Sequence, residues 1–572
     1  MKENLIEIEN QIDKLLEDLS IWKLSFQDIY STLLLMTEKI DYDGDKDTAM
    51  DYLSRISLIY PIIKKLAQNI EIESTTTSIL KTGNMQFLED INFLIAYAHF
   101  SLLMPQIHRN VLSVNQVSEF CFELDFANDD IKNSELIDKL YSTISLQVSF
   151  SSKELESIKL HTSKKASKRE YNLNGLDFQF INKLFQHHKK FFINIQVLPD
   201  EIIESKLGFN HNDFILFSSA LKAFSDYFIV LARSYKEQIN EEKYSPEEND
   251  KLMSEYMEWS VCCLKYQALG WFLGSTGLNK DKFDIILSYF IEIYSNDTGI
   301  QFQENSSCGE GYLPPITLIQ KSIIFSPHAL RYLVNFNNIL YSINHKNKKL
   351  FDEEISQHLE PTLINQLEYL FSKFKDLEVR KNVNYGISEI DMLLLSKKEN
   401  ICITIQVKTT IAPDSTRSVT RVQDRTLEAF KQINIFESLS HQEKADILKR
   451  EYDIDIDDIK FINLIVVRSC AGSDKAWEIN DKYKIINYSL ISKILCEKLK
   501  NNDSEFSNFE NEILLKQREL IVLSNWRIEY ETLKIDKYEI KFPNISFDDN
   551  KIIPYNLSTF ECFPKLESAI FN

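Results

Sequence analysis

The sequence predicts an α+β multidomain protein in which a large all-α N-terminal region precedes an α/β domain with a mixed central sheet. Glycine and proline number only 12 each among 572 residues, against typical shares of ~7% and ~5%. So few chain breakers favour long helices. Apolar residues recur at helical spacings of three and four in the N-terminal part. After residue 350 the pattern changes to short apolar runs that are typical of strands.

Composition and charge limit the classes of function. Hydrophobic residues make up 44% of the chain, charged residues 26%, and the net charge is −20. An acidic chain is repelled by phosphate backbones unless its basic residues gather in one place. The sequence contains no GxxxxGK[ST] and no GxGxxG pattern, which argues against an NTPase or a Rossmann dehydrogenase.

Cysteine usage and the apolar segments predict a cytoplasmic protein without a membrane span. The eight cysteines are scattered, and none forms a CxxC pair, as a reducing compartment allows. The acidic start after Met1 does not resemble a signal peptide. The most apolar stretch, Phe93–Ile107, is shorter than the ~20 residues of a membrane helix.

Changes in composition predict five segments. They are a helical domain (1–150), a basic linker (151–170), a second helical domain (171–345), an α/β domain (346–500) and a C-terminal extension without an assigned role (501–572). Within the helical domains, amphipathic stripes predict helices at Met50–Asn69, Met85–Met104, Asp213–Tyr235 and Lys251–Leu273. The lysine-rich linker either contacts nucleic acid or is a solvated loop.

The α/β domain has the predicted order α-β-β-β-α-β-β-α. Glu353–Phe374 is expected to form one or two helices, and Val419–Ser438 and Ser489–Leu499 two more. The continuous apolar run Phe461–Arg468 predicts a strand buried on both faces. The other expected strands are Leu377–Val383, Glu389–Leu395, Asn400–Thr409 and Lys484–Tyr488.

Two neighbouring strands concentrate polar side chains at one end. Side chains alternate faces along a strand, so Glu389 and Asp391 share a face, and Ile390, Met392 and Leu394 are expected on the opposite, buried one.

On the next strand, Gln406 and Lys408 share a face. If the two strands form a hairpin across Ser396–Glu399, Asp391 lies beside both. An acid, a neutral oxygen ligand and an ammonium suit phosphodiester hydrolysis with Mg²⁺ or Mn²⁺, which bind oxygen ligands and activate water.

This arrangement resembles the PD-(D/E)xK nuclease superfamily, which has the restriction-endonuclease-like fold. Glu389-Ile390-Asp391 followed by Gln406-Val407-Lys408 is closest to the branch with glutamine in the third-strand motif, as in Mrr-type endonucleases. The resemblance covers about a quarter of the chain, approximately residues 350–500. Ile390 stands where the motif's name has proline, and Gln406 replaces a carboxylate.

The resemblance implies roles for individual residues. Asp391 would be the principal metal ligand and Lys408 the catalytic lysine. Gln406 would occupy the second acidic position as a catalytic and metal-binding residue, and the Val407 carbonyl would lend another oxygen to the metal.

The family often places a metal-binding glutamate in the preceding helix. Glu360 and Glu368 are both candidates, and Glu368 fits the spacing to Val379 better. Glu389 and Glu360 remain candidates for a supporting role.

A basic stripe is expected on the helix that follows these strands. Arg417, Arg421 and Arg425 are four residues apart, so a helix would align them for phosphate contacts. The alternative is an exposed face on which they pair with Asp424 and Glu428.

The predicted function is a metal-dependent DNA endonuclease, in the manner of a bacterial antiviral defence or restriction effector. Its helical region would mediate homo-oligomerisation, docking of other subunits of a defence complex, or substrate sensing. Two alternatives stay open: a non-catalytic scaffold or binding subunit that keeps the nuclease fold, and an RNase on the same fold.

Overall fold

The structure is a computed structural model, and it describes residues 2–42, 46–67, 85–145, 177–191, 197–239, 244–295, 313–386, 388–411, 416–454 and 458–555. In these residues helices surround three sheets, each with parallel and antiparallel strand pairs. The mixed α/β class is therefore confirmed. The prediction of an all-α region before residue 346 is wrong, because two of the sheets take strands from it. The predicted basic linker, 151–170, lies outside the described residues.

The chain begins with a helical layer whose helices pack around a common apolar core. Phe26, Tyr30 and Tyr60 are almost fully buried there, and their rings stack or meet edge to face. These helices are α1 (Lys2–Glu17), α2 (Phe26–Tyr42), α3 (Lys46–Leu66) and α5 (Met85–His108), with the short 3₁₀ helix η1 (Ser20–Lys23).

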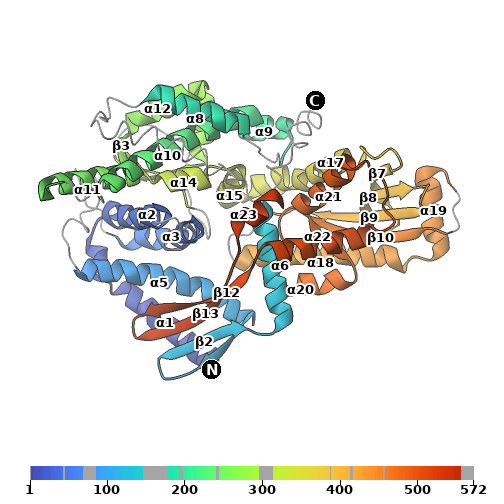
Figure 1. Ribbon diagram of the computed structural model, residues 1–572, viewed down its shortest axis with the longest axis horizontal. Coiled ribbons are helices and arrows are strands. Elements are labelled where there is room, and N and C mark those ends of the chain that lie inside the picture. Colours follow the sequence, from blue (N-terminus) through green and yellow to red (C-terminus); the bar gives the residue numbers. More distant parts are fainter. Residues whose placement is uncertain are drawn as a thin grey trace.

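The first sheet joins distant parts of the sequence. Its strand order is β1-β2-β13-β12, with Cys121 of β2 paired in parallel to Glu539 of β13. Figure 1 shows these late strands beside α1 and α5. The bounds are β1 (Leu112–Gln116), β2 (Cys121–Phe126), β12 (Arg527–Ile535) and β13 (Tyr538–Ser546). Part of the extension without an assigned role therefore completes an N-terminal sheet.

The second body is built around α10 (His211–Ile239), which is buried on almost all sides. The helices around it are α8 (Phe178–Phe191), α9 (Asp200–Leu207), α11 (Pro246–Ser260), α12 (Leu269–Thr276), α13 (Lys280–Ser288), α14 (Pro327–Leu333) and α15 (Phe336–Lys346). Helices α5 and α10 have the length and apolar composition of a membrane span. Their most apolar windows are 44% and 89% buried in the protein, and a core helix passes the same test.

A four-stranded sheet of order β3-β6-β5-β4 lies in this body. Its strands are β3 (Cys262–Lys265), β4 (Ile291–Ser295), β5 (Ile316–Ile319) and β6 (Ser322–Phe325). Strand β3 interrupts the continuous helix predicted over Lys251–Leu273, which is wrong at this point. A four-residue apolar run is compatible with either structure, and pairing with β6 decides it.

The α/β body contains a five-stranded sheet of order β11-β10-β9-β8-β7. Strands β7 to β9 form an antiparallel meander, and β9, β10 and β11 run parallel. The strands are β7 (Glu378–Asn384), β8 (Glu389–Ser396), β9 (Ile401–Lys408), β10 (Lys460–Val467) and β11 (Lys484–Asn487).

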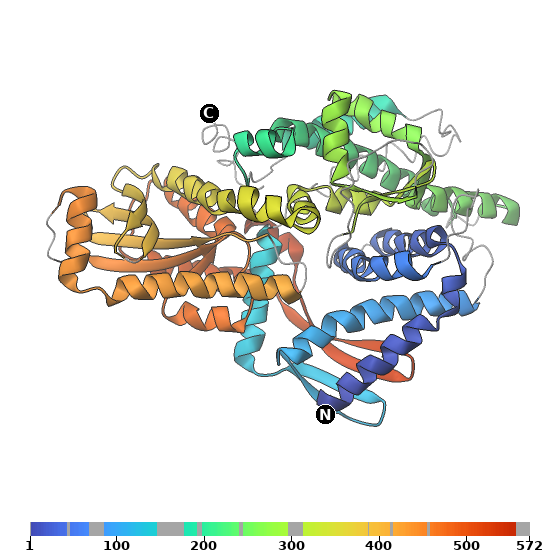
Figure 2. The same ribbon diagram turned by 180° about the vertical axis from the view of Figure 1, so that it is seen from behind.

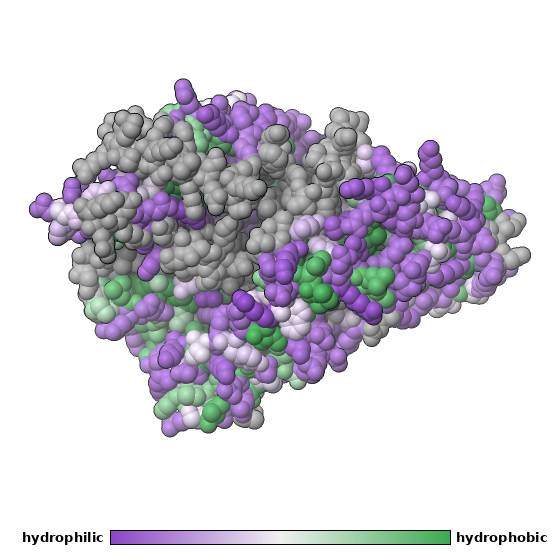
Figure 3. All heavy atoms as spheres, viewed as in Figure 1, coloured by the Kyte–Doolittle hydropathy of each residue, from purple (hydrophilic) through white to green (hydrophobic). Residues whose placement is uncertain are grey.

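Helices cover both faces of this sheet. Figure 2 shows α17 (Leu359–Phe371) and α18 (Thr416–Ser438) on opposite sides of it. The other helices are α19 (His441–Tyr452), α20 (Asp474–Trp477), α21 (Tyr488–Lys500) and α22 (Phe509–Leu523). Short helices α16 (Lys348–Leu350), η4 (Phe351–Ile355) and η5 (Ser356–His358) lead into α17. Figure 3 shows mostly hydrophilic side chains on the described surface of this body.

One N-terminal helix belongs to the α/β body. The Asp138 carboxylate of α6 (Asp129–Ser145) accepts hydrogen bonds from the backbone N–H groups of Ala471 (2.7 Å) and Gly472 (3.1 Å) and from Trp477 Nε1 (3.0 Å). The Tyr141 hydroxyl donates to the carbonyl of Ile485 (3.1 Å). Helix α6 therefore packs at the C-terminal ends of β10 and β11, although residues 1–150 were expected to form a separate domain.

Candidate active site

The sheet of the α/β body opens between β8 and β9 at Asp391. The antiparallel ladder between these strands ends at the pair Met392–Ile405. Strand β9 continues to pair with β10 as far as Lys408 and Val467. Asp391 and the last residues of β9 therefore face a gap in which backbone groups lack a partner strand.

The neighbouring strand β7 is also irregular at this level. Asn382, which lies opposite Asp391, has a left-handed backbone (φ 53°). Met392 packs in the main core with helix α17, whereas Ile390 packs with Leu393 and Leu395 in a smaller cluster on the other face. The prediction that Ile390 shares a face with Met392 is wrong, because regular alternation does not continue through this opening.

Side chains of the predicted motif span the gap. The Val407 backbone N–H donates to Asp391 Oδ2 (2.6 Å), and Gln406 Nε2 donates to the carbonyl of Glu389 (2.6 Å). Asp391 is 7% exposed and Gln406 is fully buried. Gln406 Oε1 has no hydrogen-bond partner among the described residues, and burying such an acceptor is unfavourable unless a ligand satisfies it.

Lys408 is also buried, and its ammonium approaches a glutamate of α17. Lys408 Nζ lies 3.3 Å from Glu360 Oε1 and 3.5 Å from Oε2. Lys408 is 6% exposed, and the Glu360 side chain is about one third exposed. The charges of Lys408 and Glu360 both act on the pKa of Asp391, but Asp391 and Lys408 do not form a direct ion pair.

Burial controls the protonation of the two carboxylates. Desolvation raises the pKa of Asp391 to about 7, while Lys408 and the Val407 N–H oppose the shift. Desolvation also raises the pKa of Glu360, and the nearby Lys408 again opposes it. A site that holds a carboxylate with a pKa near neutrality is a candidate functional site.

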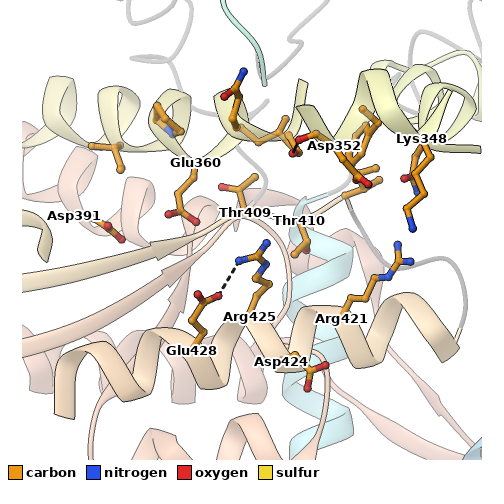
Figure 4. Close-up of a pocket in the computed structure, with 18 of the residues that line it drawn as sticks. Lys348, Asp352, Glu360, Asp391, Thr409, Thr410, Arg421, Asp424, Arg425 and Glu428 are labelled. Carbon is orange, nitrogen blue, oxygen red and sulfur yellow. Dashed lines mark hydrogen bonds and ion pairs between the residues drawn. The ribbon is translucent and has the colours of Figure 1, made fainter. Parts of the chain in front are cut away.

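These residues lie beside a cavity of about 1370 Å³, whose lining includes Glu360 and Asp391. Helix α17 and the preceding segment form one wall, α18 forms the opposite wall, and the ends of β8 and β9 lie between them (Figure 4). Counted over the described residues, the lining carries more carboxylates than fixed positive charges. The carboxylates are Asp352, Glu360, Glu389, Asp391, Asp424 and Glu428, and the positive side chains are Lys348, Arg421 and Arg425.

The glutamate that the structure brings to this cavity is Glu360 rather than Glu368, so the preference for Glu368 is corrected. Glu368 is in an ion pair with Lys381 Nζ (2.6 Å) and does not line the cavity. Eight residues separate the two glutamates, which is ~12 Å along a helix. The distance along the sequence to Val379 could not show which end of α17 lies against the ends of β8 and β9.

The predicted basic stripe contributes two arginines to the cavity. Arg421 and Arg425 line it, and Arg425 is in an ion pair with Glu428 (2.8 Å). The Arg417 side chain lies outside the described residues. Gln432, one helical turn beyond Glu428, lines the cavity with a buried Oε1 that has no hydrogen-bond partner in the described part of the chain.

Nothing in the sequence indicated that the segment before α17 lines the cavity. Tyr341, Lys348, Phe351 and Asp352 line the cavity from α15, α16 and η4. No motif marks them: the run Lys346-Asn347-Lys348-Lys349 has the composition of an ordinary polar connection. Only the packing of this segment over the strand ends reveals its place.

The donor set fits a hard divalent cation. The N–H and C=O of one strand residue point to the same side, so the Val407 carbonyl faces the gap where its N–H meets Asp391. With the Asp391 carboxylate, this gives two oxygen donors, and Mg²⁺ keeps several waters in such sites. Among the described residues, no three His, Cys, Asp or Glu side chains lie close enough to hold a metal by themselves.

Comparison of the chain with protein-family models, with curated proteins and with solved structures gave no match.

Proposed function

We propose that the protein is a metal-dependent nuclease that hydrolyses phosphodiester bonds of DNA on a restriction-endonuclease-like fold. The observation that carries the proposal is the meeting of Asp391, Lys408 and Glu360 where β8 and β9 part. The order of α17, the β7–β9 meander, α18 and the parallel strand β10 also agrees with that fold.

In this proposal each residue has a role. The Asp391 carboxylate and the Val407 carbonyl hold Mg²⁺ or Mn²⁺, with Gln406 Oε1 as a further oxygen. A bound divalent ion supplies a Lewis acid for the phosphoryl oxygen and lowers the pKa of coordinated water. Lys408 places its ammonium at the scissile phosphate, where it orients the attacking water and stabilises developing negative charge. Glu360 holds Lys408 in place until substrate arrives.

The wider role follows from the architecture and belongs to the proposal. The helical bodies carry no catalytic motif, and we assign to them the control of the nuclease, through assembly with copies of this chain or with other subunits. By analogy of architecture, such a fusion suits a cytoplasmic antiviral or restriction effector.

The test is cleavage of supercoiled plasmid, linear duplex, single-stranded DNA and RNA with Mg²⁺ or Mn²⁺, with EDTA as a control. Asp391→Asn and Lys408→Met should each lower cleavage by a factor of ~10² or more, the scale for loss of an electrostatic catalytic group. Asp376→Asn and Lys397→Met are matched controls, because both residues are partly exposed in surface ion pairs outside the cavity. Equal activity in all four variants would refute the assignment of the site.

A non-catalytic scaffold is the second candidate. It is favoured by the absence of a three-carboxylate cluster among the described residues and by the pairing of Lys408 with Glu360. Titration calorimetry with Mn²⁺ separates the two: the nuclease proposal expects binding that Asp391→Asn abolishes. If the wild type binds neither metal nor nucleic acid, the scaffold is the better description.

A further inference from the structure

Two basic side chains from different parts of the chain converge on the cavity. Lys348 comes from α16 and Arg421 from α18, and Figure 4 shows them pointing toward one another. Within the described residues neither forms an ion pair; Asp352 and Asp424 also line the cavity, but they do not pair with either cation. Two like charges that face each other repel, so this arrangement is stable only when an anion or solvent screens it.

The converging cations are separated from the acidic centre. In Figure 4 Asp391 and Glu360 lie toward one end of the cavity, Lys348 and Arg421 toward the other, and Arg425 between them. A chain of phosphates laid along the cavity would place one phosphate at the acidic centre and a later one between the two cations. The cavity therefore has a direction along which an extended polyanion fits.

The two walls of the cavity favour a single strand over intact duplex. The cavity of about 1370 Å³ is larger than the roughly 300–1,000 Å³ of pockets for drug-sized ligands, so it has room for more than one nucleotide. Helix α18 lines the cavity on one side and α15 to η4 line it on the other, so a bound strand would lie between two protein walls. Tyr341 and Phe351 also line this wall, but each is only 8% exposed, so the wall offers a strand mainly polar groups such as Asn344, Lys348 and Gln357.

We propose that Lys348 and Arg421 form a phosphate clamp that holds a single nucleic-acid strand in the cavity. The helical segment before α17 then supplies half of the substrate-binding site, and duplex enters only where its strands are separated. The inference rests on the proposed function for what happens to the strand, but the clamp is a binding site that can be tested without cleavage.

The experiment measures binding of a fluorescein-labelled 12-nucleotide dT strand to the full chain in EDTA by anisotropy. The variants are Lys348→Glu and Arg421→Glu, and the matched controls are the exposed neighbours Lys349→Glu and Lys431→Glu, which do not line the cavity. Each clamp variant should weaken binding by about tenfold and reduce the slope of log K against log[salt] by ~0.7, the value for one lost single-strand contact. The control variants should change neither quantity.

A 12-base-pair duplex and a 12-nucleotide U strand serve as competitors. We expect the duplex to compete at least tenfold more weakly than the dT strand, and the U strand shows whether RNA shares the site. The clamp is refuted if clamp and control variants weaken binding equally, and the single-strand assignment is refuted if duplex binds as tightly. If the wild type binds the dT strand through the clamp but cuts no substrate with metal, the proposed hydrolysis fails and the clamp stands.

Discussion

Asp391 occupies a position that favours chemistry over stability. Its carboxylate is almost completely buried and receives one backbone hydrogen bond, from Val407. Desolvation outweighs that bond and the nearby Lys408, so the pKa rises to about 7. In the unfolded chain the same group has an ordinary pKa, and the folded protein therefore holds a proton that the unfolded chain releases.

This difference predicts that Asp391→Asn stabilises the metal-free protein at neutral pH. Between pH ~4 and ~7 the folded state binds more protons at this site, so the wild-type free energy of unfolding falls as pH rises. Asparagine removes the effect, and above pH 7 the gain should be on the order of 1–4 kcal/mol. Urea unfolding in EDTA at pH 4.5 and pH 8 measures it. A variant less stable than wild type at pH 8 would contradict the burial argument.

The residue types of the site could be predicted from the sequence, but their geometry could not. Strand alternation placed Asp391, Gln406 and Lys408 near one another. It could not show that β8 and β9 part there, because a ladder ends through tertiary packing that no local pattern encodes. Nor could it show that Lys408 pairs with Glu360, which depends on the position of α17 over the strand ends.

At the scale of elements, the loop after β10 is fitted tightly against helix α18. Gly472 has φ 108°, a backbone conformation that suits glycine. An added Cβ would lie 2.6 Å from the backbone N of Gln423 and 2.8 Å from the carbonyl O of Val419. Helix α18, which carries the cavity arginines, is therefore positioned by direct backbone contact with this loop.

We predict that Gly472→Ala destabilises the protein by about 2–4 kcal/mol, because backbone strain and steric overlap add. Gly274→Ala is the control, since nothing lies within 4 Å of its added Cβ and alanine favours helix by up to ~1 kcal/mol. Thermal unfolding of both variants measures the difference. Equal melting temperatures would show that α18 moves away without cost.

The helices and strands of the α/β body match their sequence-based prediction closely. In the second body the helix predicted over Asp213–Tyr235 lies within α10, but the four-stranded sheet was not predicted. The run Phe461–Arg468 forms β10 almost as expected, because a long buried strand has a clear pattern. Strand β3 is only four residues long, and its residues were predicted to be part of a helix. Its identity depends on β6, about 60 residues later along the chain.

At the scale of the whole molecule, strands from both halves of the chain share one core. Ile540 of β13 is 1% exposed and packs in a cluster with Phe122 and Leu124 of β2 and Ile8 of α1. Composition could not predict this sheet, since pairing between distant strands leaves no local signature. The predicted separate extension, residues 501–572, is for this reason structurally continuous with the N-terminal layer in its described part.

We expect Ile540→Ala to cost about 2–5 kcal/mol, the range for deleting a buried isoleucine side chain. Glu539→Gln is the control, because the Glu539 side chain is half exposed. Hydrogen exchange should show faster exchange in residues 112–126 and 527–546 together, since β2 and β13 are paired. Faster exchange in only one of these segments would mean that the two hairpins are stable independently.

The pairing of β2 with β13 also has a consequence for synthesis. About 420 residues separate the paired positions Cys121 and Glu539, and ribosomes add roughly 5–20 residues per second. The edge of β2 thus leaves the ribosome about 20–80 s before its partner strand exists. During that interval it is an open strand edge of the kind that pairs with other chains, so a growing molecule is more exposed to misassembly than a finished one.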